Sequence, residues 1–144
     1  MVLTRVAMFI TGAVARAIFP LAPEWYNPDP LQPAIYLSAW PFIDMWGCWD
    51  SHWLWGISVT GYANPVGLNF FPLYPLAARY AGFVTGDPFI AGLLVSDACM
   101  VGSCYLLYKV ARLDLDPSRS AGAVAFLLLF PTSFIMNAFF TESL

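Results

Sequence analysis

The chain has 144 residues, of which 60% are hydrophobic and only 10% are charged, and its formal net charge is -3. A soluble domain carries about 25% charged residues, so this composition indicates a membrane protein, and the small negative charge excludes a nucleic-acid-binding surface. The three cysteines are an odd number without close pairing, which argues against a disulfide framework. The sequence has no CxxC or HExxH motif, so no metal site is expected.

The first apolar segment covers residues 6–21, VAMFITGAVARAIFPL, and predicts a short first membrane helix. A signal peptide is the alternative, but Arg16 interrupts the apolar stretch and no small-x-small cleavage site follows cleanly. Residues 22–87 then form a large loop that contains all six tryptophans. Because tryptophan prefers the membrane interface, we expect short interfacial helices in this loop, separated by its prolines.

Two longer apolar segments follow. Residues 88–110 have the roughly 20 residues that a membrane-crossing helix needs, with Asp97 as the one interior charge. Residues 121–140 predict the last helix, which Pro131 should kink because proline lacks a backbone N–H. The predicted fold class is all-α, a polytopic membrane helix bundle of about three transmembrane helices with interfacial helices in a large first outer loop. We expect residues 1–144 to be a single membrane domain, the N-terminal part of a longer protein.

The basic residues predict the orientation of these helices. Arg5 precedes the first helix, and Lys109, Arg112 and Arg119 surround the link between the last two. Basic residues near helix ends favour the cytoplasmic side of the membrane. We therefore expect residues 22–87 to face away from the cytoplasm.

Asp50, in GCWDSHWLWG, is the first candidate for chemistry. A carboxylate at the interface can act as a general base toward an acceptor hydroxyl, and the alternative role is to cap the helix that follows. His52 lies two positions further on. Because positions two apart on a helix do not face each other, we expect a surface or interfacial histidine and not a dyad.

Four other charged residues are singled out. Arg79 is suited to a two-pronged contact with a lipid-linked phosphate, and its alternative is a headgroup contact or a local ion pair. Glu142 ends the last helix at a depth that suits a second acid in the cavity of Asp50, and equally a solvated helix end. Arg16 and Asp97 are expected inside the membrane at similar depth, so we predict a structural ion pair between them.

Three strings, WDSHWLWGISVTGY, FFPLYPLAAR and FPTSFIMNAFFTESL, occur in this order along the chain. Together they resemble motifs of the PIG-V family of mannosyltransferases, in order and in rough spacing. The resemblance covers residues 49–144. Ser58 and Phe140 stand where that family favours alanine and tyrosine, and neither departure removes a charged group.

The resemblance implies an inverting glycosyltransferase of the GT-C class. Its donor would be a polyprenyl- or dolichyl-phosphate mannose or related sugar, and its acceptor a glycolipid or glycan, with no cofactor beyond the donor and no metal. It implies action on the periplasmic face in bacteria, or in the lumen of the endoplasmic reticulum. The essential acid of the class corresponds to Asp50. Arg79 and Glu142 match motif positions, and with Trp49 and His52 beside Asp50 they are assigned to substrate binding.

Two alternatives remain. One is a GT-C enzyme that uses another sugar or a protein acceptor, which the sequence does not distinguish. The other is a transporter or scaffold without enzymatic activity. Transporters place ionisable groups along a path near the bilayer midplane, whereas most acids here are expected at the outer surface, which favours surface chemistry.

Overall fold

The computed structural model describes residues 2–19, 37–38, 40–47, 49–142 and 144, and these residues form helices and connecting turns without any β-strand. The four longest helices are α1 (Val2–Ile18), α4 (Leu73–Thr85), α5 (Pro88–Ala111) and α6 (Pro117–Leu129). The shorter elements are α2 (Pro41–Asp44), α3 (Ser51–Thr60) and the 3-10 helices η2 (Pro65–Asn69) and η3 (Pro131–Asn137). The predicted all-α class is confirmed for this part of the chain.

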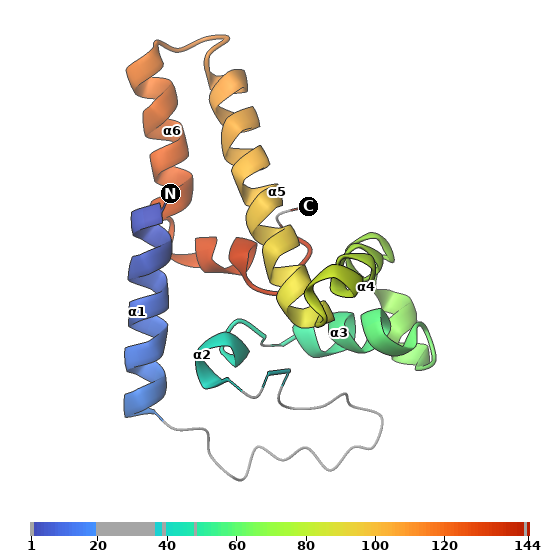
Figure 1. Cartoon of the computed structure of the whole chain (residues 1–144). Coiled ribbons are helices and arrows are strands. Elements are labelled where there is room, and N and C mark those ends of the chain that lie inside the picture. Colours follow the sequence, from blue (N-terminus) through green and yellow to red (C-terminus); the bar gives the residue numbers. More distant parts are fainter. Residues whose placement is uncertain (1, 20–36, 39, 48, 143) are drawn as a thin grey trace.

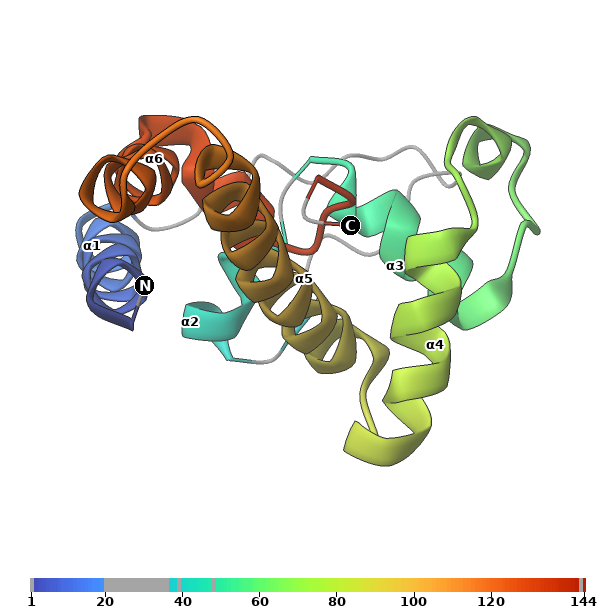
Figure 2. The same cartoon turned by 90° about the horizontal axis from the view of Figure 1, so that it is seen from above.

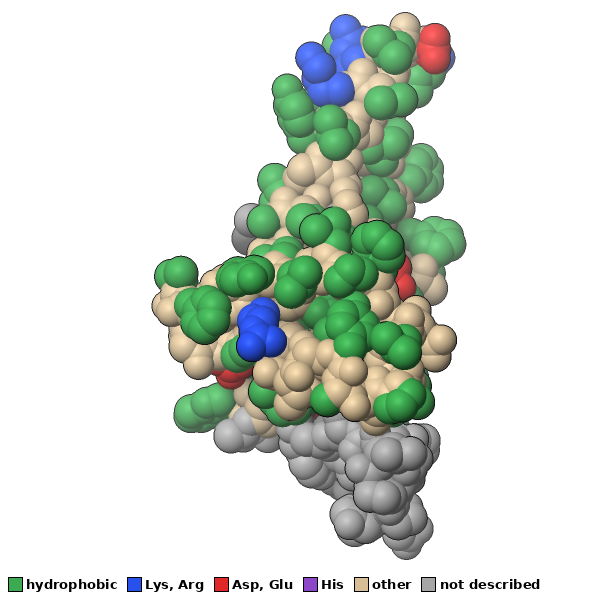
Figure 3. Space-filling model, turned by 90° about the vertical axis from the view of Figure 1, so that its right-hand side faces the viewer, with side chains coloured by type: hydrophobic (Ala, Val, Ile, Leu, Met, Phe, Trp, Pro, Cys, Tyr) green, Lys and Arg blue, Asp and Glu red, His purple; other side chains and the backbone are tan. Residues whose placement is uncertain are grey.

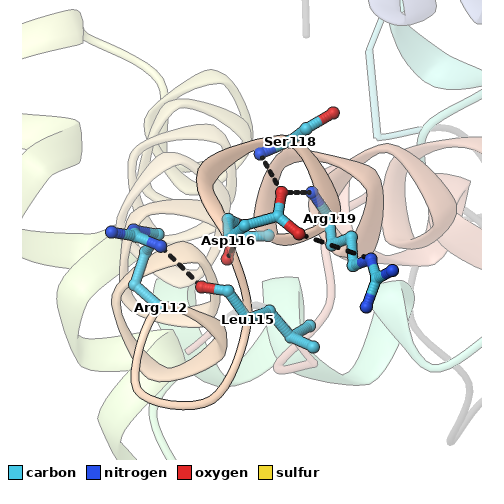
Figure 4. Close-up of polar contacts among 6 residues, drawn as sticks. Arg112, Leu115, Asp116, Ser118 and Arg119 are labelled. Atoms are coloured by element: carbon cyan, nitrogen blue, oxygen red, sulfur yellow. Dashed lines mark hydrogen bonds and ion pairs between the residues drawn. The ribbon is translucent and has the colours of Figure 1, made fainter.

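Helices α5 and α6 form an antiparallel hairpin that extends from the rest of the molecule (Figure 1). Local bonds close the turn at its tip. Asp116 Oδ1 accepts from Ser118 N at 3.0 Å and from Arg119 N at 3.1 Å, and Asp116 Oδ2 lies 3.3 Å from Arg119 Nε (Figure 4). Arg112 donates to Leu115 O in the same turn. Both arginines are exposed at the tip.

The helix predicted over residues 88–110 agrees with α5 to within one residue. It begins at Pro88 because Asp87 Oδ1 accepts from Phe89 N at 2.8 Å, and proline is favoured at a first helical position, where its missing N–H would have no partner. α5 has 24 residues, and only 22% of its apolar stretch is buried in protein. Among the described residues it is the one unbroken helix long and apolar enough to cross a membrane.

The other two predicted membrane helices differ from the expectation. α1 has 17 residues and starts four residues earlier than predicted, while residues 20 and 21 of the predicted segment lie outside the described part. α6 ends at Leu129, and η3 then turns away by 82°. Phe130 is extended (φ -63°, ψ 133°), because the residue before Pro131 is kept out of the helical region. The predicted kink is confirmed. With α6 and η3 counted as one broken span, the described residues contain at most two candidate spans, and the three-helix bundle is not confirmed.

Seen along the hairpin, α1 and α6 lie on one side of α5, and α3 and α4 lie on the other (Figure 2). The core lies where α3 and α4 meet the first turns of α5. Its buried members are Leu37, Leu54, Tyr74, Ala78, Phe89 and Phe139. Gly92 of α5 allows the Phe139 ring to pack directly on the helix, since a Cβ at this position would overlap the ring. The segment after η3 is thereby held against α5.

Candidate functional site

Three segments that are far apart in the sequence meet beside α5. Trp49, just before α3, packs its ring on Phe134 of η3 and on Phe140, with centroid distances of 6.3 and 6.2 Å. Tyr74 of α4 meets Phe139 edge-on at 5.1 Å. We call these five residues the aromatic cluster. Each of the three strings that resemble the mannosyltransferase family contributes at least one ring to it.

Hydrogen bonds tie the aromatic cluster to α5. Tyr74 Oη donates to Gly92 O at 2.9 Å and lies 2.9 Å from Ser96 Oγ. Ser96 Oγ in turn donates to Phe140 O at 3.4 Å. Burial raises the pKa of Tyr74, so the phenol stays protonated and able to donate. The position of the cluster on α5 is therefore set by polar as well as apolar contacts.

Asp50 borders the aromatic cluster, immediately before α3. Its side chain is exposed and makes no capping hydrogen bond, although capping was the alternative to a catalytic role. The preceding residue, Trp49, has φ +49°, the one positive φ of a non-glycine residue in the described part of the chain. Such a conformation costs about 1–3 kcal/mol, and the packing of Trp49 against the cluster offsets it. The Asp50 side chain beside it stays exposed.

The two residues that follow Asp50, Ser51 and His52, are less exposed than Asp50 itself. Ser51 is fully buried, and its hydroxyl has no partner among the described residues. His52 is half-buried, and its Nδ1 lies 3.1 Å from Trp49 O. This contact keeps the imidazole against the turn that precedes α3.

Arg79 lies on the exposed face of α4. It follows Tyr74 by five residues, which places it about 140° around the helix from that buried side chain at 3.6 residues per turn. Leu76, Tyr80 and Phe83 are exposed on the same helix, and Figure 3 shows a basic side chain among hydrophobic ones on the face that carries α4. A cation among exposed apolar side chains is suited to contact a lipid headgroup, which was the alternative role expected for Arg79. Its role in substrate phosphate binding stays a prediction.

Glu142 follows the aromatic cluster in the exposed C-terminal segment, which runs beside α5 (Figure 1). Burial is the main cause of the raised pKa of Tyr74, and the charge of Glu142 is a minor cause in the same direction. Asp50 and Glu142 therefore both border the aromatic cluster. Within the described residues no group of three or more His, Cys, Asp or Glu side chains is placed to hold a metal ion.

The predicted ion pair between Arg16 and Asp97 is wrong. Arg16 Nη2 lies 3.6 Å from Asp44 Oδ2. Asp44 Oδ1 also accepts from Leu37 N at 2.8 Å and from Ser38 N at 3.2 Å. The prediction assumed that the end of the first helix and the start of α5 lie at one depth in the membrane. In the structure Arg16 is near the far end of α1, and the other end of α1 faces Asp97.

Arg5, Trp46 and Asn137 are candidate residues that the sequence reasoning missed. With Asp97 they line a cavity of about 330 Å³ between α1, α5 and η3. The sequence interpretation treats Arg5 only as a marker of the cytoplasmic side and Asn137 as part of an apolar helix. A signal was nevertheless present, because polar side chains within or beside apolar membrane segments are costly unless they have a partner.

No protein-family model matches the chain, and neither a curated protein nor a solved structure matches it significantly. What the site does must therefore follow from its own residues.

Proposed function

We propose that this protein is a membrane glycosyltransferase of the GT-C type. It moves a mannosyl or related residue from a polyprenyl- or dolichyl-phosphate to a glycolipid or glycan acceptor. The observation that carries the proposal is the state of Asp50, an exposed carboxylate without a capping bond beside the aromatic cluster. An acid that served only as a cap would accept from the first free amides of α3. The open carboxylate favours a catalytic role.

Asp50 acts as the general base of a single displacement. Its carboxylate accepts the proton of an acceptor hydroxyl while the hydroxyl oxygen attacks the anomeric carbon of the donor. The new glycosidic bond forms as the bond between the anomeric carbon and the phosphate oxygen breaks. The lipid phosphate leaves with the electron pair, and the configuration at the anomeric carbon inverts. The transition state has oxocarbenium character, as in glycoside hydrolysis.

The substrates are contacted by the residues around Asp50. Trp49 is 66% exposed, so part of its ring remains available for an apolar sugar face. His52 is held beside it by its contact with Trp49 O. In this proposal Arg79 contacts the lipid phosphate from the membrane-facing side of α4, and Glu142 accepts a sugar hydroxyl near Tyr74.

The active face lies away from the cytoplasm in this proposal. Lys109, Arg112 and Arg119 are exposed around the hairpin tip, and basic residues of this kind favour the cytoplasmic side. Helix α3, which follows Asp50, lies near the opposite end of α5 (Figure 1). The chain then belongs to a multi-pass membrane enzyme that works on the periplasmic face or in the lumen of the endoplasmic reticulum.

Transfer by an Asp50→Asn variant of the full-length protein tests the proposal. Asparagine keeps the size of the side chain and removes its basicity, so transfer from polyprenyl-phosphate mannose to native membrane acceptors should fall about 10²–10⁴-fold. Asp87→Asn is the matched control, because Asp87 caps α5 and asparagine caps a helix equally well. Rates are normalised to folded protein. Near-normal transfer by Asp50→Asn would remove the catalytic assignment.

A further inference from the structure

A second site lies in the cavity between α1, α5 and η3, apart from the aromatic cluster. Its volume of about 330 Å³ is within the range of about 300–1,000 Å³ found for small-molecule sites. Its polar lining residues are Arg5, Asp97 and Asn137, and its apolar ones are Val6, Phe9, Ile10, Trp46 and Leu93. Polar groups are thus gathered at one place in an otherwise apolar surrounding.

Two of the polar side chains have unused hydrogen-bonding capacity. Arg5 Nε and Nη2 are buried and have no partner among the described residues. Asn137 is only 6% exposed, and its Nδ2 donates to Ser133 O at 3.5 Å, while its Oδ1 has no partner within the described part of the chain. Buried polar groups without partners are destabilising, so an arrangement of two of them around one cavity indicates a ligand.

Asp97 does not supply the missing partner for the Arg5 guanidinium. The two charges act on each other across the cavity, yet they form no salt bridge within 4.0 Å in the described part of the chain. Arg5 Nη1 only contacts Met8 Sδ at 3.9 Å. Because Arg5 and Asp97 both line the cavity without pairing directly, a ligand there can contact both charges.

We propose that this cavity binds the head group of a membrane lipid in which a phosphodiester carries a polyol, such as a polyprenyl-phosphate sugar. The guanidinium of Arg5 offers two adjacent N–H donors, which suit two oxygens of one phosphate. Asn137 Oδ1 and the Asp97 carboxylate can only accept, so they need hydroxyl donors. A bare phosphate would face the negative charge of Asp97, whereas a polyol places hydroxyl groups between the two anions.

The position of the cavity favours a ligand that arrives from the bilayer. Asp97 lies about 14 Å along α5 from Pro88, at about 1.5 Å per residue, and is therefore well inside the span. Val6, Phe9 and Ile10 line the cavity and are also exposed on the surface of α1. These apolar side chains provide a surface along which the hydrocarbon chain of the lipid lies. Arg79 contacts the phosphate of the reacting donor beside Asp50, so the lipid in this cavity is a further molecule. That it belongs to the donor class rests on the proposed function, whereas the binding chemistry does not.

Equilibrium binding to the purified full-length protein in nanodiscs tests the site. The probes are polyprenyl-phosphate mannose, polyprenyl phosphate and phosphatidylinositol. Arg5→Gln should weaken binding of the mannosyl lipid about 10- to 100-fold through the lost charged hydrogen bonds. Arg112→Gln, which removes the same charge at the exposed hairpin tip, should leave it unchanged. Asp97→Asn should weaken binding of the mannosyl lipid but not of polyprenyl phosphate, because only the sugar needs the carboxylate.

The three probes distinguish the sources of the ligand. Arg5-dependent binding of phosphatidylinositol in preference to the mannosyl lipid supports the site and assigns it to a phospholipid. Binding of both lipids that is unchanged in Arg5→Gln overturns the proposal. Since binding and transfer are separate measurements, Arg5-independent binding together with Asp50-dependent transfer defeats only this inference. Arg5-dependent binding with Asp50-independent transfer removes only the catalytic assignment of Asp50, and Arg5-dependent binding without any transfer defeats only the proposed transferase.

A protection experiment covers the case in which Arg5→Gln does not fold. Val6→Cys places a thiol at the cavity, and its alkylation is followed by peptide mass spectrometry, which separates it from the native cysteines. The mannosyl lipid or phosphatidylinositol should slow this alkylation several-fold. Val14→Cys, on an exposed part of α1 away from the cavity lining, should react at the same rate with or without lipid. Equal rates at Val6→Cys with and without both lipids would overturn the proposal.

Discussion

The Arg16 guanidinium lies 3.6 Å from the Asp44 carboxylate, and this contact ties the end of α1 to the short helix α2. The two side chains are only 20% and 7% exposed. Asp44 also accepts the backbone N–H groups of Leu37 and Ser38, so one carboxylate organises the segment that enters α2. The two residues therefore contribute unequally to the stability of the fold, because Arg16 makes one long ion pair and Asp44 makes three contacts.

Replacement of Asp44 should therefore destabilise the protein more than replacement of Arg16. Asp44→Ala removes two hydrogen bonds to a charged acceptor, each of which contributes about 1.5–3 kcal/mol, whereas Arg16→Ala removes only the long ion pair. Chemical unfolding in detergent measures the free energy of unfolding of both variants.

The effects of Arg16→Ala and Asp97→Ala on the free energy of unfolding should add in the double variant to within about 0.3–0.5 kcal/mol. A coupling well above this value would show that Arg16 and Asp97 interact after all.

Gly92 and Gly102 of α5 should respond in opposite ways to alanine. A Cβ at Gly92 would overlap the Phe139 ring, so Gly92→Ala should destabilise by about 1–3 kcal/mol, as other overpacked sites do. Gly102 has open space around it, and alanine there should be neutral or stabilise the helix by about 0.5–1 kcal/mol. Unfolding of the two variants under identical conditions provides the comparison. Equal effects would mean that Phe139 does not pack on α5 at Gly92.

Asp50→Ala should have little effect on stability, in contrast to its expected effect on transfer. Because the side chain makes no capping bond, the free energy of unfolding should change by less than about 0.5 kcal/mol. Asp116→Ala is the reference, because Asp116 accepts from Ser118 N and Arg119 N, and loss of such a cap costs about 0.5–2 kcal/mol. A cost for Asp50→Ala as large as that for Asp116→Ala would mean that Asp50 caps α3.

Impermeant thiol labelling in intact cells should report the proposed topology. Asn69 and Ser118 are both exposed and lie toward opposite ends of the α5 span in the proposal. Asn69→Cys should be labelled from outside, and Ser118→Cys only after the cells are opened, because the basic hairpin tip favours the cytoplasm. Labelling of both after lysis is the control. The reverse pattern in intact cells would place the aromatic cluster on the cytoplasmic side.

Helix limits could be predicted from the sequence where neighbouring residues determine them. Residues 88–110 were expected as a helix and α5 spans Pro88–Ala111, because its apolar length and the Asp87 cap are local properties. The break at Pro131 was predicted for the same reason, since the missing N–H and the restricted preceding residue act within one turn. The size of the bend, 82°, depends on how the segment packs and was not predictable.

The partners of the charged residues were decided only by the tertiary structure. Sliding one helix along another leaves every local pattern unchanged but alters which side chains meet. Arg16 therefore pairs with Asp44, and Arg5 lines the same cavity as Asp97. The surroundings of Asp50 were also decided by the tertiary structure. The neighbouring Trp49, which has a positive φ, packs on one ring of η3 and on one ring of the C-terminal segment. The sequence by itself determined the helical class and pointed to Asp50, Arg79 and Glu142, but the second cavity and its lining by Arg5 and Asn137 appeared only in the structure. The arrangement of these residues into a site required contacts between segments far apart in the chain, which no local pattern encodes.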